Sequence, residues 1–386
     1  MDELNFLQGR RVLLTGHTGF KGSWLSLWLC QHGARVIGYA ADVPTSPSLF
    51  ESLDLRAQLR DYRGDIRDAD RLRRVIHRER PEVIIHLAAQ ALVPRSYQDP
   101  KETFDVNVAG TVNVLEALRE APGVRVLINV TSDKCYEDRG WGAAFQEEDS
   151  LGGRDPYSAS KACAELITAA YRRSFFAPER AAEHGVGLAT VRAGNVIGGG
   201  DWAAHRLVPD CIRALRAGKP VLLRRPQAVR PWQHVLEALA GYLLLAVRLW
   251  KNPGDYTGAW NFGPPPESSW PVVDVAREVF RLWGRGDWPI ASGPQEMTAA
   301  ETDCLRLCSA KATARLAWRP QWNLEAAIAR TVEWYQLFEA GADATALRAF
   351  SCRQIAEYEA AWDQSVGACK TDDRGPPTVV ELGVHG

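Results

Sequence analysis

The chain has 386 residues, 46% hydrophobic and 24% charged, an ordinary globular composition for one large or two modest domains. Its formal net charge of −1 gives no electrostatic basis for binding nucleic acid or an anionic membrane, so neither partner is expected. No apolar run reaches the roughly 18 residues of a membrane span and the first residues do not read as a signal peptide, so we expect a cytoplasmic protein.

A glycine-rich turn is the first feature of the chain. A short apolar segment at 11–15 precedes it, a helical segment at 23–32 follows it, and a second apolar segment lies at 35–39. This context makes the motif Gly16-x-x-Gly19-x-x-Gly22 a candidate dinucleotide site, because glycines let backbone N–H groups approach a pyrophosphate at a helix N-terminus. The alternative is a plain strand-to-helix turn. The predicted cofactor contacts here are Gly16, Thr18, Gly19, Phe20, Lys21 and Gly22.

The next two strands bear on which dinucleotide binds. The second strand ends without the usual acid, and Asp42 follows slightly late, where it either binds the adenosine ribose or caps the next turn. No arginine follows directly to receive a 2′-phosphate, which favours NAD over NADP. A third strand is predicted at 61–66. Asp65 and Ile66 at its end are candidate adenine contacts, unless Asp65 only caps the following helix.

A fourth strand is predicted at 81–89. It ends in Leu87, Ala88 and Ala89, and the two alanines would let the backbone pass close to a cofactor. A helix predicted at 103–121 carries Asn107, which is either a polar relay to the cofactor side or a partner of the backbone of a neighbouring strand.

The fifth strand, 127–131, leads into the centre of the predicted site. Strand ends of this kind lie at the sheet edge where ligands bind. Tyr157 and Lys161 are four residues apart in a predicted helix at 157–175, so they share one helical face. A free phenol has a pKa of roughly 10, and a nearby ammonium favours its ionised form. The pair is therefore a candidate base for removing a hydroxyl proton.

The rest of the chain is predicted to complete an α/β fold. Further strands are expected at 187–191, 218–225, 259–263 and 304–307, with a long helix at 229–250. Alternating strands and helices predict a Rossmann doubly wound parallel sheet, with a smaller mixed α/β C-terminal substrate lobe. We assign 1–192 and 229–262 to the NAD-binding domain, 193–228 and 263–366 to the lobe, and 367–386 to a loose tail. Eight scattered cysteines without a Cys-x-x-Cys pair indicate reduced thiols and no metal site.

The glycine motif, the Tyr157-x-x-x-Lys161 pair and a Ser or Thr at the tip of the fifth strand together resemble the extended short-chain dehydrogenase/reductase superfamily. Longer blocks narrow the resemblance to the CDP-glucose 4,6-dehydratases, over roughly residues 6–365. These blocks are 15–28 (TGHTGFKGSWLSLW), 131–136 (TSDKCY), 149–165 (DSLGGRDPYSASKACAE), 194–202 (GNVIGGGDW) and 230–237 (RPWQHVLE).

The resemblance implies an enzyme that converts CDP-glucose to CDP-4-keto-6-deoxyglucose with NAD, for deoxysugars of bacterial surface polysaccharides such as the lipopolysaccharide O-antigen. Tyr157 would take the proton of the sugar 4-hydroxyl while a hydride leaves C4 for NAD, and Lys161 would lower the tyrosine pKa and hold the nicotinamide ribose. Asp133 would act as the acid for the C6 hydroxyl and Lys134 as the C5 base. The hydride then returns to C6. Alternatively, Asp133 and Lys134 hold each other charged as a salt pair, or form a surface turn.

The resemblance also implies substrate contacts and a homo-oligomer, a homodimer or homotetramer. Thr131 or Ser132 would bond the sugar 4-oxygen, and Asn195 would position the sugar. Arginines fit phosphate oxygens with a fork of donors. The predicted substrate contacts are Ser132, Asn195, Arg206, Leu207, Arg230 and His234, although the arginines could form surface ion pairs and His234 could only cap or pack.

Two other functions remain open. A 4-epimerase or a dehydratase for another nucleotide sugar would use the same fold, but an epimerase has no need of the acid–base pair Asp133–Lys134. A binding protein without turnover would not require Tyr157 and Lys161. The choice of cytosine as the base rests on resemblance alone.

Overall fold

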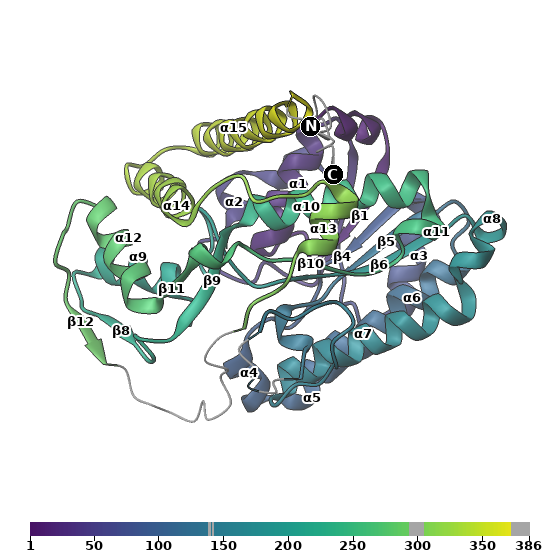
Figure 1. The fold of residues 1–386 in the computed structure, drawn as a ribbon, viewed down its shortest axis with the longest axis horizontal. Helices are drawn as coiled ribbons and strands as arrows, with labels where there is room; N and C mark the ends of the chain where they lie inside the picture. Colours follow the sequence, from purple (N-terminus) through teal and green to yellow (C-terminus); the bar gives the residue numbers. More distant parts are fainter. Residues whose placement is uncertain (138–139, 141–142, 293–304, 372–386) are drawn as a thin grey trace, which may run out of the picture.

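A seven-stranded parallel sheet forms the centre of the protein, seen here in a computed structural model that describes residues 1–137, 140, 143–292 and 305–371 (Figure 1). The strand order is β10-β6-β5-β4-β1-β2-β3, and every neighbouring pair is parallel. The strands are β1 (Arg11–Thr15), β2 (Arg35–Ala40), β3 (Arg60–Arg63), β4 (Val83–His86), β5 (Val126–Val130), β6 (Gly187–Ala193) and β10 (Gly258–Phe262). The predicted doubly wound sheet is therefore confirmed.

Helices cover both faces of this sheet, so its central strands are nearly continuous apolar runs. Alternate strand residues enter two separate cores: Leu13 and Leu127 pack on one side, Leu14 and Ile128 on the other. The first side is covered by α3 (Ala69–Glu79), α6 (Gly110–Glu120) and α7 (Pro156–Phe175), the second by α1 (Phe20–Gln31) and α10 (Val235–Lys251) (Figure 1).

Smaller sheets and helices form a second region beside the carboxyl ends of the strands (Figure 1). A three-stranded sheet has the order β11-β9-β7, and β8 pairs in parallel with β12. These strands are β7 (Asn195–Ile197), β8 (Val221–Leu223), β9 (Val229–His234), β11 (Ser269–Pro271) and β12 (Ile290–Ser292); the helices are α9 (Leu207–Ala217), α12 (Val272–Leu282) and α14 (Leu324–Glu339). Helix α13 (Ala310–Leu316) instead packs on α10 and β10, and α15 (Ala344–Thr371) packs on α1 and α14 (Figure 1).

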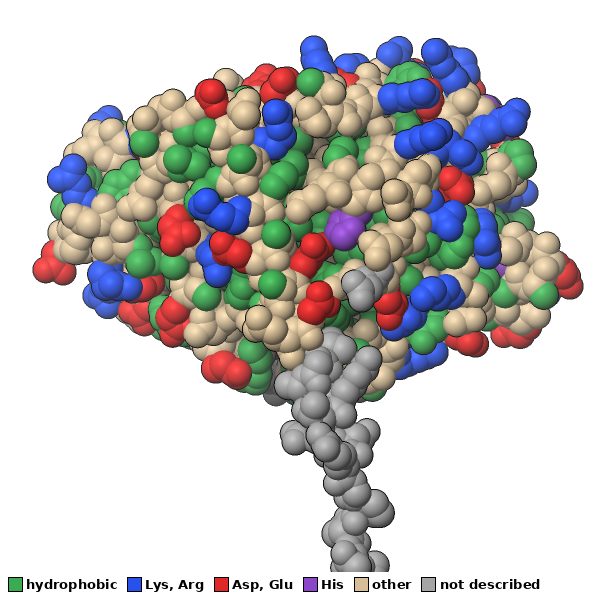
Figure 2. All heavy atoms as spheres, turned by 90° about the horizontal axis from the view of Figure 1, so that it is seen from above, with side chains coloured by type: hydrophobic (Ala, Val, Ile, Leu, Met, Phe, Trp, Pro, Cys, Tyr) green, Lys and Arg blue, Asp and Glu red, His purple; other side chains and the backbone are tan. Residues whose placement is uncertain are grey.

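Short elements complete the described chain. They are η1 (Asp2–Leu7), α2 (Leu49–Ser52), η2 (Leu55–Gln58), α4 (Val93–Gln98), α5 (Pro100–Phe104), η3 (Asp105–Ala109), η4 (Asp133–Cys135), η5 (Pro178–Arg180), α8 (Ala181–His184), α11 (Pro253–Tyr256) and η6 (Pro266–Ser268). Over the residues described, none of the helices has the length and apolar character needed to cross a membrane. Basic and acidic side chains both occur across the face seen in Figure 2.

Several predicted boundaries were wrong. The helix predicted at 229–250 begins only at Val235, because 229–234 form β9, which pairs with β7 and β11. The helix predicted at 103–121 is interrupted by the π-helical turn η3. Of the strand predicted at 304–307, residue 304 lies outside the described part, and Leu307 makes one isolated bridge with Phe145. Helix α15 extends into the predicted tail as far as Thr371, and 372–386 are not described.

Candidate active site

The glycine turn joins β1 to α1 and is shaped by close backbone contacts. Gly16 has a φ of +73°, and a Cβ there would lie 2.7 Å from the Ala88 nitrogen. A Cβ on Gly22 would lie 2.2 Å from the Gly16 oxygen. The first bond of α1 runs from the Ser23 N–H to the Gly19 oxygen, at 2.8 Å. The amides before it, which have no partner within their own helix, suit an anion such as a dinucleotide pyrophosphate.

The loops around the turn are tied together by hydrogen bonds. The Thr18 hydroxyl donates to the Asp42 oxygen at 2.6 Å, and the Tyr39 hydroxyl donates to the Asp65 oxygen at 2.9 Å. The Asp65 carboxylate pairs with Arg67 at 2.6 Å, which lowers the pKa of Asp65. Asp42 itself is exposed, so its carboxylate is accessible for a ribose contact while its backbone oxygen holds the turn.

Beyond β4, the chain passes against the glycine turn as expected. The Leu87 N–H donates to the Thr15 oxygen at 3.1 Å, and the Ala88 N–H donates to the Thr15 hydroxyl at 3.2 Å. Asn107 lies in the π-helical turn, buried, and exchanges two bonds with the Gln90 backbone at 2.8 and 3.0 Å. Its amide also donates to the Ser160 hydroxyl on α7 at 2.9 Å. Asn107 thus fastens the loop after β4, which contains Ala89 and Gln90, to α7. Ile66 is buried nearby, against Gly110.

Helix α7 carries Tyr157 and Lys161 into the centre of the site. The Asp155 side chain caps the helix by accepting from the Ser158 N–H at 2.9 Å. Lys161 is buried and donates to the Val130 oxygen at 3.2 Å, and burial lowers its pKa to about 8. Burial raises the pKa of Tyr157 to about 12, a rise that its hydrogen bond with Ser132 and the charge of Arg206 oppose. Burial in this structure therefore favours the phenol form of Tyr157, which must lose its own proton before it can accept one from the substrate.

The two hydroxyl residues after β5 face different partners. The Thr131 hydroxyl donates to a Glu165 carboxylate oxygen, whereas the Ser132 side chain is hydrogen bonded to Tyr157. Adjacent residues of an extended chain point to opposite sides, so only one of the two reaches the tyrosine. The geometry thus favours Ser132 over Thr131 for the contact with the sugar 4-oxygen, and Thr131 supports the site from behind.

Asp133 and Lys134 begin the short turn η4, which Ser132 caps. The Ser132 hydroxyl accepts from the Lys134 N–H at 3.2 Å and donates to the Asp133 carboxylate at 2.9 Å. Asp133 is buried, and a Cβ on Gly194 would lie only 3.2 Å from its Oδ2 atom. Lys134 is half-buried. Between these two described residues there is no ion pair within 4.0 Å, which argues against the salt-pair alternative.

Positive side chains gather around Asp133. Lys21, in the first turn of α1, has its pKa lowered to about 8 by burial and by the charges of Arg206 and Lys161, while Asp133 opposes the shift. Arg206 occupies the N-cap position of α9, before Leu207, without a side-chain capping bond; its side chain is about one third exposed at 35% and pairs with Asp201 at 2.8 Å. A bound anion such as the diphosphate of a sugar nucleotide would reduce the repulsion of Lys21 by Arg206 and Lys161.

The remaining predicted substrate residues lie on β7 and β9. Asn195 is half-buried and stands opposite Trp232 in the parallel pairing of these strands. The Arg230 guanidinium donates to the Val229 oxygen at 3.2 Å. His234 is 0% exposed and caps α10 by accepting from the Leu236 N–H at 3.3 Å. Its ring packs between Trp24 and Trp322, so the structure favours the capping role that we left open over a substrate contact.

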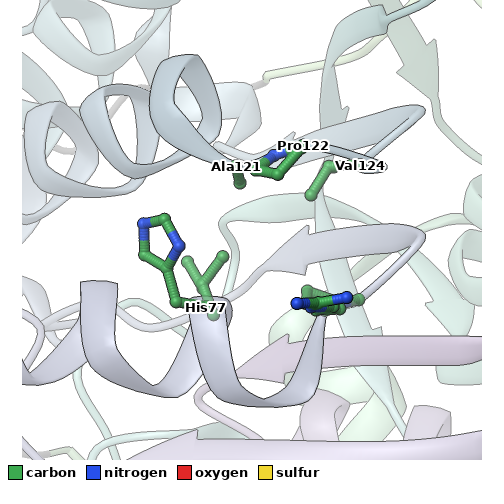
Figure 3. Close-up of a pocket in the computed structure, with 7 residues that line it drawn as sticks. His77, Ala121, Pro122 and Val124 are labelled. Carbon is green, nitrogen blue, oxygen red and sulfur yellow. The ribbon is translucent and has the colours of Figure 1, made fainter.

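One cavity elsewhere is too small for a nucleotide sugar. It lies between the end of α3 and the turn before β5, at the edge of the sheet opposite to the site, and His77 extends toward Ala121 across it (Figure 3). Its volume is about 80 Å³, below the range of several hundred Å³ typical of ligand pockets. In the part of the chain that is described, no group of three or more His, Cys, Asp or Glu residues is placed to hold a metal ion.

The fold and the Tyr157–Lys161 centre beside a glycine turn define a class of NAD-dependent enzymes. Residues 12–257 match the NAD dependent epimerase/dehydratase family, and the chain belongs to this family. Within it, the chain is 46% identical over 361 residues to the CDP-glucose 4,6-dehydratase of Salmonella typhimurium, an alignment that covers 94% of this chain and 99% of that relative. The resemblance predicted from the motifs is confirmed.

Solved structures share the fold. A dTDP-glucose 4,6-dehydratase from Bacillus anthracis in complex with NAD matches with a TM-score of 0.71 and 24% identity, over 86% of this chain and 98% of that chain. A UDP-glucose 4-epimerase from Thermus thermophilus in complex with NAD matches with a TM-score of 0.72 and 25% identity, over 84% of this chain and 99% of that chain. NAD is accordingly the cofactor of this family, as predicted from the glycine turn and from the absence of an arginine after the second strand.

Proposed function

We propose that the protein is a CDP-glucose 4,6-dehydratase, which forms CDP-4-keto-6-deoxyglucose and water by an internal oxidation and reduction. The observation that carries the proposal is the turn Ser132–Lys134. It places a carboxylate and an amine on the turn whose serine is bonded to Tyr157. An elimination needs such an acid–base pair next to the oxidation site, and the 46% identity to a CDP-glucose 4,6-dehydratase supports cytosine as the base.

The residues divide the work as follows. Tyr157 accepts the proton of the sugar 4-hydroxyl, which Ser132 orients, and Lys161 supplies positive charge behind the tyrosine. NAD, when bound at the glycine turn, supplies the acceptor for the C4 hydride and later returns it to C6. Before that return, Lys134 as the free amine removes the C5 proton, which the new 4-ketone has made acidic, while Asp133 as the carboxylic acid protonates the departing C6 hydroxyl. When the hydride adds to C6, Lys134 gives its proton back to C5.

Further residues hold the two nucleotides. We propose that the turn Gly16–Gly22, Asp65–Ile66 and 87–89 bind NAD, and that Arg206, Arg230, Asn195 and Leu207 bind the CDP-sugar. The proximity of the cations Lys21 and Arg206 supports this division, because a diphosphate bound near them would reduce their mutual repulsion. Residues 1–192 and 235–262 then form the cofactor domain, since β10 pairs with β6 in the large sheet. Residues 229–234, which we had assigned to this domain, form β9 in the smaller sheet and belong to the second region.

A panel of CDP-, dTDP-, UDP- and GDP-glucose, each incubated with the protein and NAD, tests the assignment. Product is followed by mass and by the alkaline absorbance of a 4-keto-6-deoxy sugar. Loss of one water from CDP-glucose, without net NADH, is the expected result. Water loss from another sugar nucleotide instead would retain the mechanism and overturn the choice of base. An unchanged mass with inversion at C4 would indicate the alternative, an epimerase.

We also propose that the protein acts in the cytoplasm as a homodimer or homotetramer, in the synthesis of deoxysugars for surface polysaccharide. A self-association face is offered by α4, α5 and α7, where large apolar side chains are exposed: Tyr97 at 43%, Phe104 at 37%, Leu166 at 57% and Phe175 at 42%. Leu166→Glu should lower the mass measured by sedimentation to that of the monomer. Leu222→Glu, at an equally exposed leucine on β8, is the matched control and should leave the mass unchanged.

A further inference from the structure

One buried carboxylate, that of Glu165, links the helix of Tyr157 and Lys161 to the turn that contains Asp133 and Lys134. Glu165 lies one helical turn after Lys161 on α7 and is 3% exposed. Arg192 on β6 donates two parallel hydrogen bonds to this carboxylate, from Nε to Oε1 at 2.9 Å and from Nη2 to Oε2 at 2.8 Å. The Thr131 hydroxyl donates to the same Oε1 atom, and the Thr190 hydroxyl donates to Oε2 at 2.7 Å. Glu165 therefore bonds both the helix-facing strand β6 and the residue that precedes Ser132.

The other end of the catalytic turn is held by the same ion pair. Arg192 Nη1 donates to the Tyr136 hydroxyl at 2.6 Å and to the Glu147 oxygen at 3.0 Å. The Tyr136 hydroxyl in turn donates to the Asn261 carboxamide oxygen at 2.8 Å. The segment 131–136 is thus anchored at its first residue by Glu165 and at its last residue by Arg192. Asp133 and Lys134 lie between the two anchors.

We propose that Glu165, acting with Arg192, is a positioning residue that sets Asp133 and Lys134 at the correct distance from Tyr157 and Lys161. The inference rests on the proposed dehydration, since that reaction uses both pairs in one turnover. The helix that carries Tyr157 also carries Glu165, so a displacement of α7 moves the turn 131–136 with it. The distance between the oxidation pair, Tyr157 and Lys161, and the elimination pair, Asp133 and Lys134, then stays constant while substrate binds and product leaves.

The charge of Glu165 has a second effect, on Lys161. Burial lowers the pKa of Lys161 to about 8, and Glu165 opposes this shift. Replacing Glu165 with glutamine removes the opposing charge and leaves Arg192 in place. The pKa of Lys161 should then fall further, so the ammonium is lost at a lower pH. A residue that only fills space would not produce this change.

Three variants separate positioning from general stability. Thr131→Val removes the hydroxyl that ties the turn to Glu165 and leaves the ion pair with Arg192 intact. Glu165→Gln removes the charge as well. Thr168→Val is the matched control, because the Thr168 hydroxyl accepts from the Asn129 side chain at 2.9 Å, a buried bond between α7 and β5 one turn farther from the site. Each variant is tested as the full-length protein with bound NAD and CDP-glucose.

Single-turnover mixing resolves the oxidation, as the rise of bound NADH, from water loss, as product mass. With Thr131→Val and Glu165→Gln, water loss should slow by about 100-fold while oxidation changes by only a few fold, because a 1 Å misplacement of a catalytic group costs about that much. Bound NADH should accumulate. The Glu165→Gln variant should also show its loss of oxidation at a lower pH than wild type, and Thr168→Val should match wild type in both steps.

Equal slowing of both steps, or no slowing in either variant, would overturn the inference. If Glu165→Gln does not fold, Thr131→Val alone decides, because it leaves no buried charge unpaired. The wild-type protein separates this outcome from failure of the proposed function. Absence of water loss from CDP-glucose in wild type refutes the dehydration itself, whereas normal wild-type turnover with unchanged variants refutes only the role of Glu165.

Discussion

Gly22 provides the sharpest test of the cofactor site, because a methyl group added there would clash with neighbouring backbone atoms. A Cβ on Gly22 would lie 2.2 Å from the Gly16 oxygen and 2.7 Å from the His17 Cα atom, against ordinary contacts of 3.4–4 Å. Both neighbours are backbone atoms. In Gly22→Ala, the first turn of α1 must therefore move away from the glycine turn by about 1 Å, a shift that such close-packed backbone resists.

The displacement should be measured as a loss of NAD affinity. A shift of about 1 Å would lengthen a typical hydrogen bond of about 2.9 Å, from a backbone amide to a pyrophosphate oxygen, beyond the range of a hydrogen bond. Losing one hydrogen bond to a charged phosphate costs about 1.5–3 kcal/mol, so the Kd for NAD should rise about 10- to 150-fold in Gly22→Ala. Isothermal titration of NAD into the folded variant provides the measurement, with the circular dichroism spectrum as the check on folding.

Gly152→Ala is the control, because a Cβ there meets its nearest neighbour at an ordinary 3.5 Å. Its affinity for NAD should equal that of wild type. A folded Gly22→Ala protein that binds NAD within twofold of wild type would show that the amides at the start of α1 do not hold the cofactor. The assignment of the glycine turn would then be refuted.

Three further predictions concern the chemistry. Tyr157→Phe should abolish turnover while NAD still binds in a titration, because the variant loses one hydroxyl and keeps the ring that fills the buried site; measurable turnover would exclude Tyr157 as the proton acceptor. Lys134→Ala should still oxidise C4 but stall before elimination, seen as accumulated bound NADH, and normal turnover would mean that Lys134 is not the C5 base. The pKa of Lys161, lowered to about 8, predicts that the oxidation rate falls as pH rises through about 8, since the ammonium is present below that pH and lost above it. The pKa of Lys21 is also lowered to about 8, so Lys21→Met is the control variant. The fall in rate should persist in this variant, and its disappearance would assign the pH effect to Lys21.

The large sheet could be predicted because its signal is local. Strands β4 and β5 are short apolar runs ended by polar residues, and the glycine turn identifies where β1 meets α1. Strand β9 could not be predicted in the same way. Its residues lead directly into the apolar helix α10, and the partners that make it a strand, β7 and β11, are 30 to 40 residues away in sequence. Tertiary pairing, which a local pattern does not contain, decides the conformation there.

The site shows the same limit at the level of single side chains. Sequence indicates that a hydroxyl at 131 or 132 serves Tyr157, but the choice depends on which face of the chain meets α7. Asn107 was ambiguous because a π-helical turn, invisible in the pattern, redirects its side chain toward Gln90. Glu165 had a signal that could have identified it: it follows Lys161 by four residues and so shares the face of α7 that contains the catalytic pair.

The central claim is that the hydride removed from C4 returns to C6 of the same sugar. A mixture of CDP-glucose deuterated at C4 and unlabelled CDP-glucose, converted in the presence of NAD, tests it by mass spectrometry of the product. The account predicts a product that has lost one water and keeps its deuterium at C6, with no exchange of label between molecules and no net NADH. Product without deuterium, label in free NADH, or an epimer of unchanged mass would contradict it.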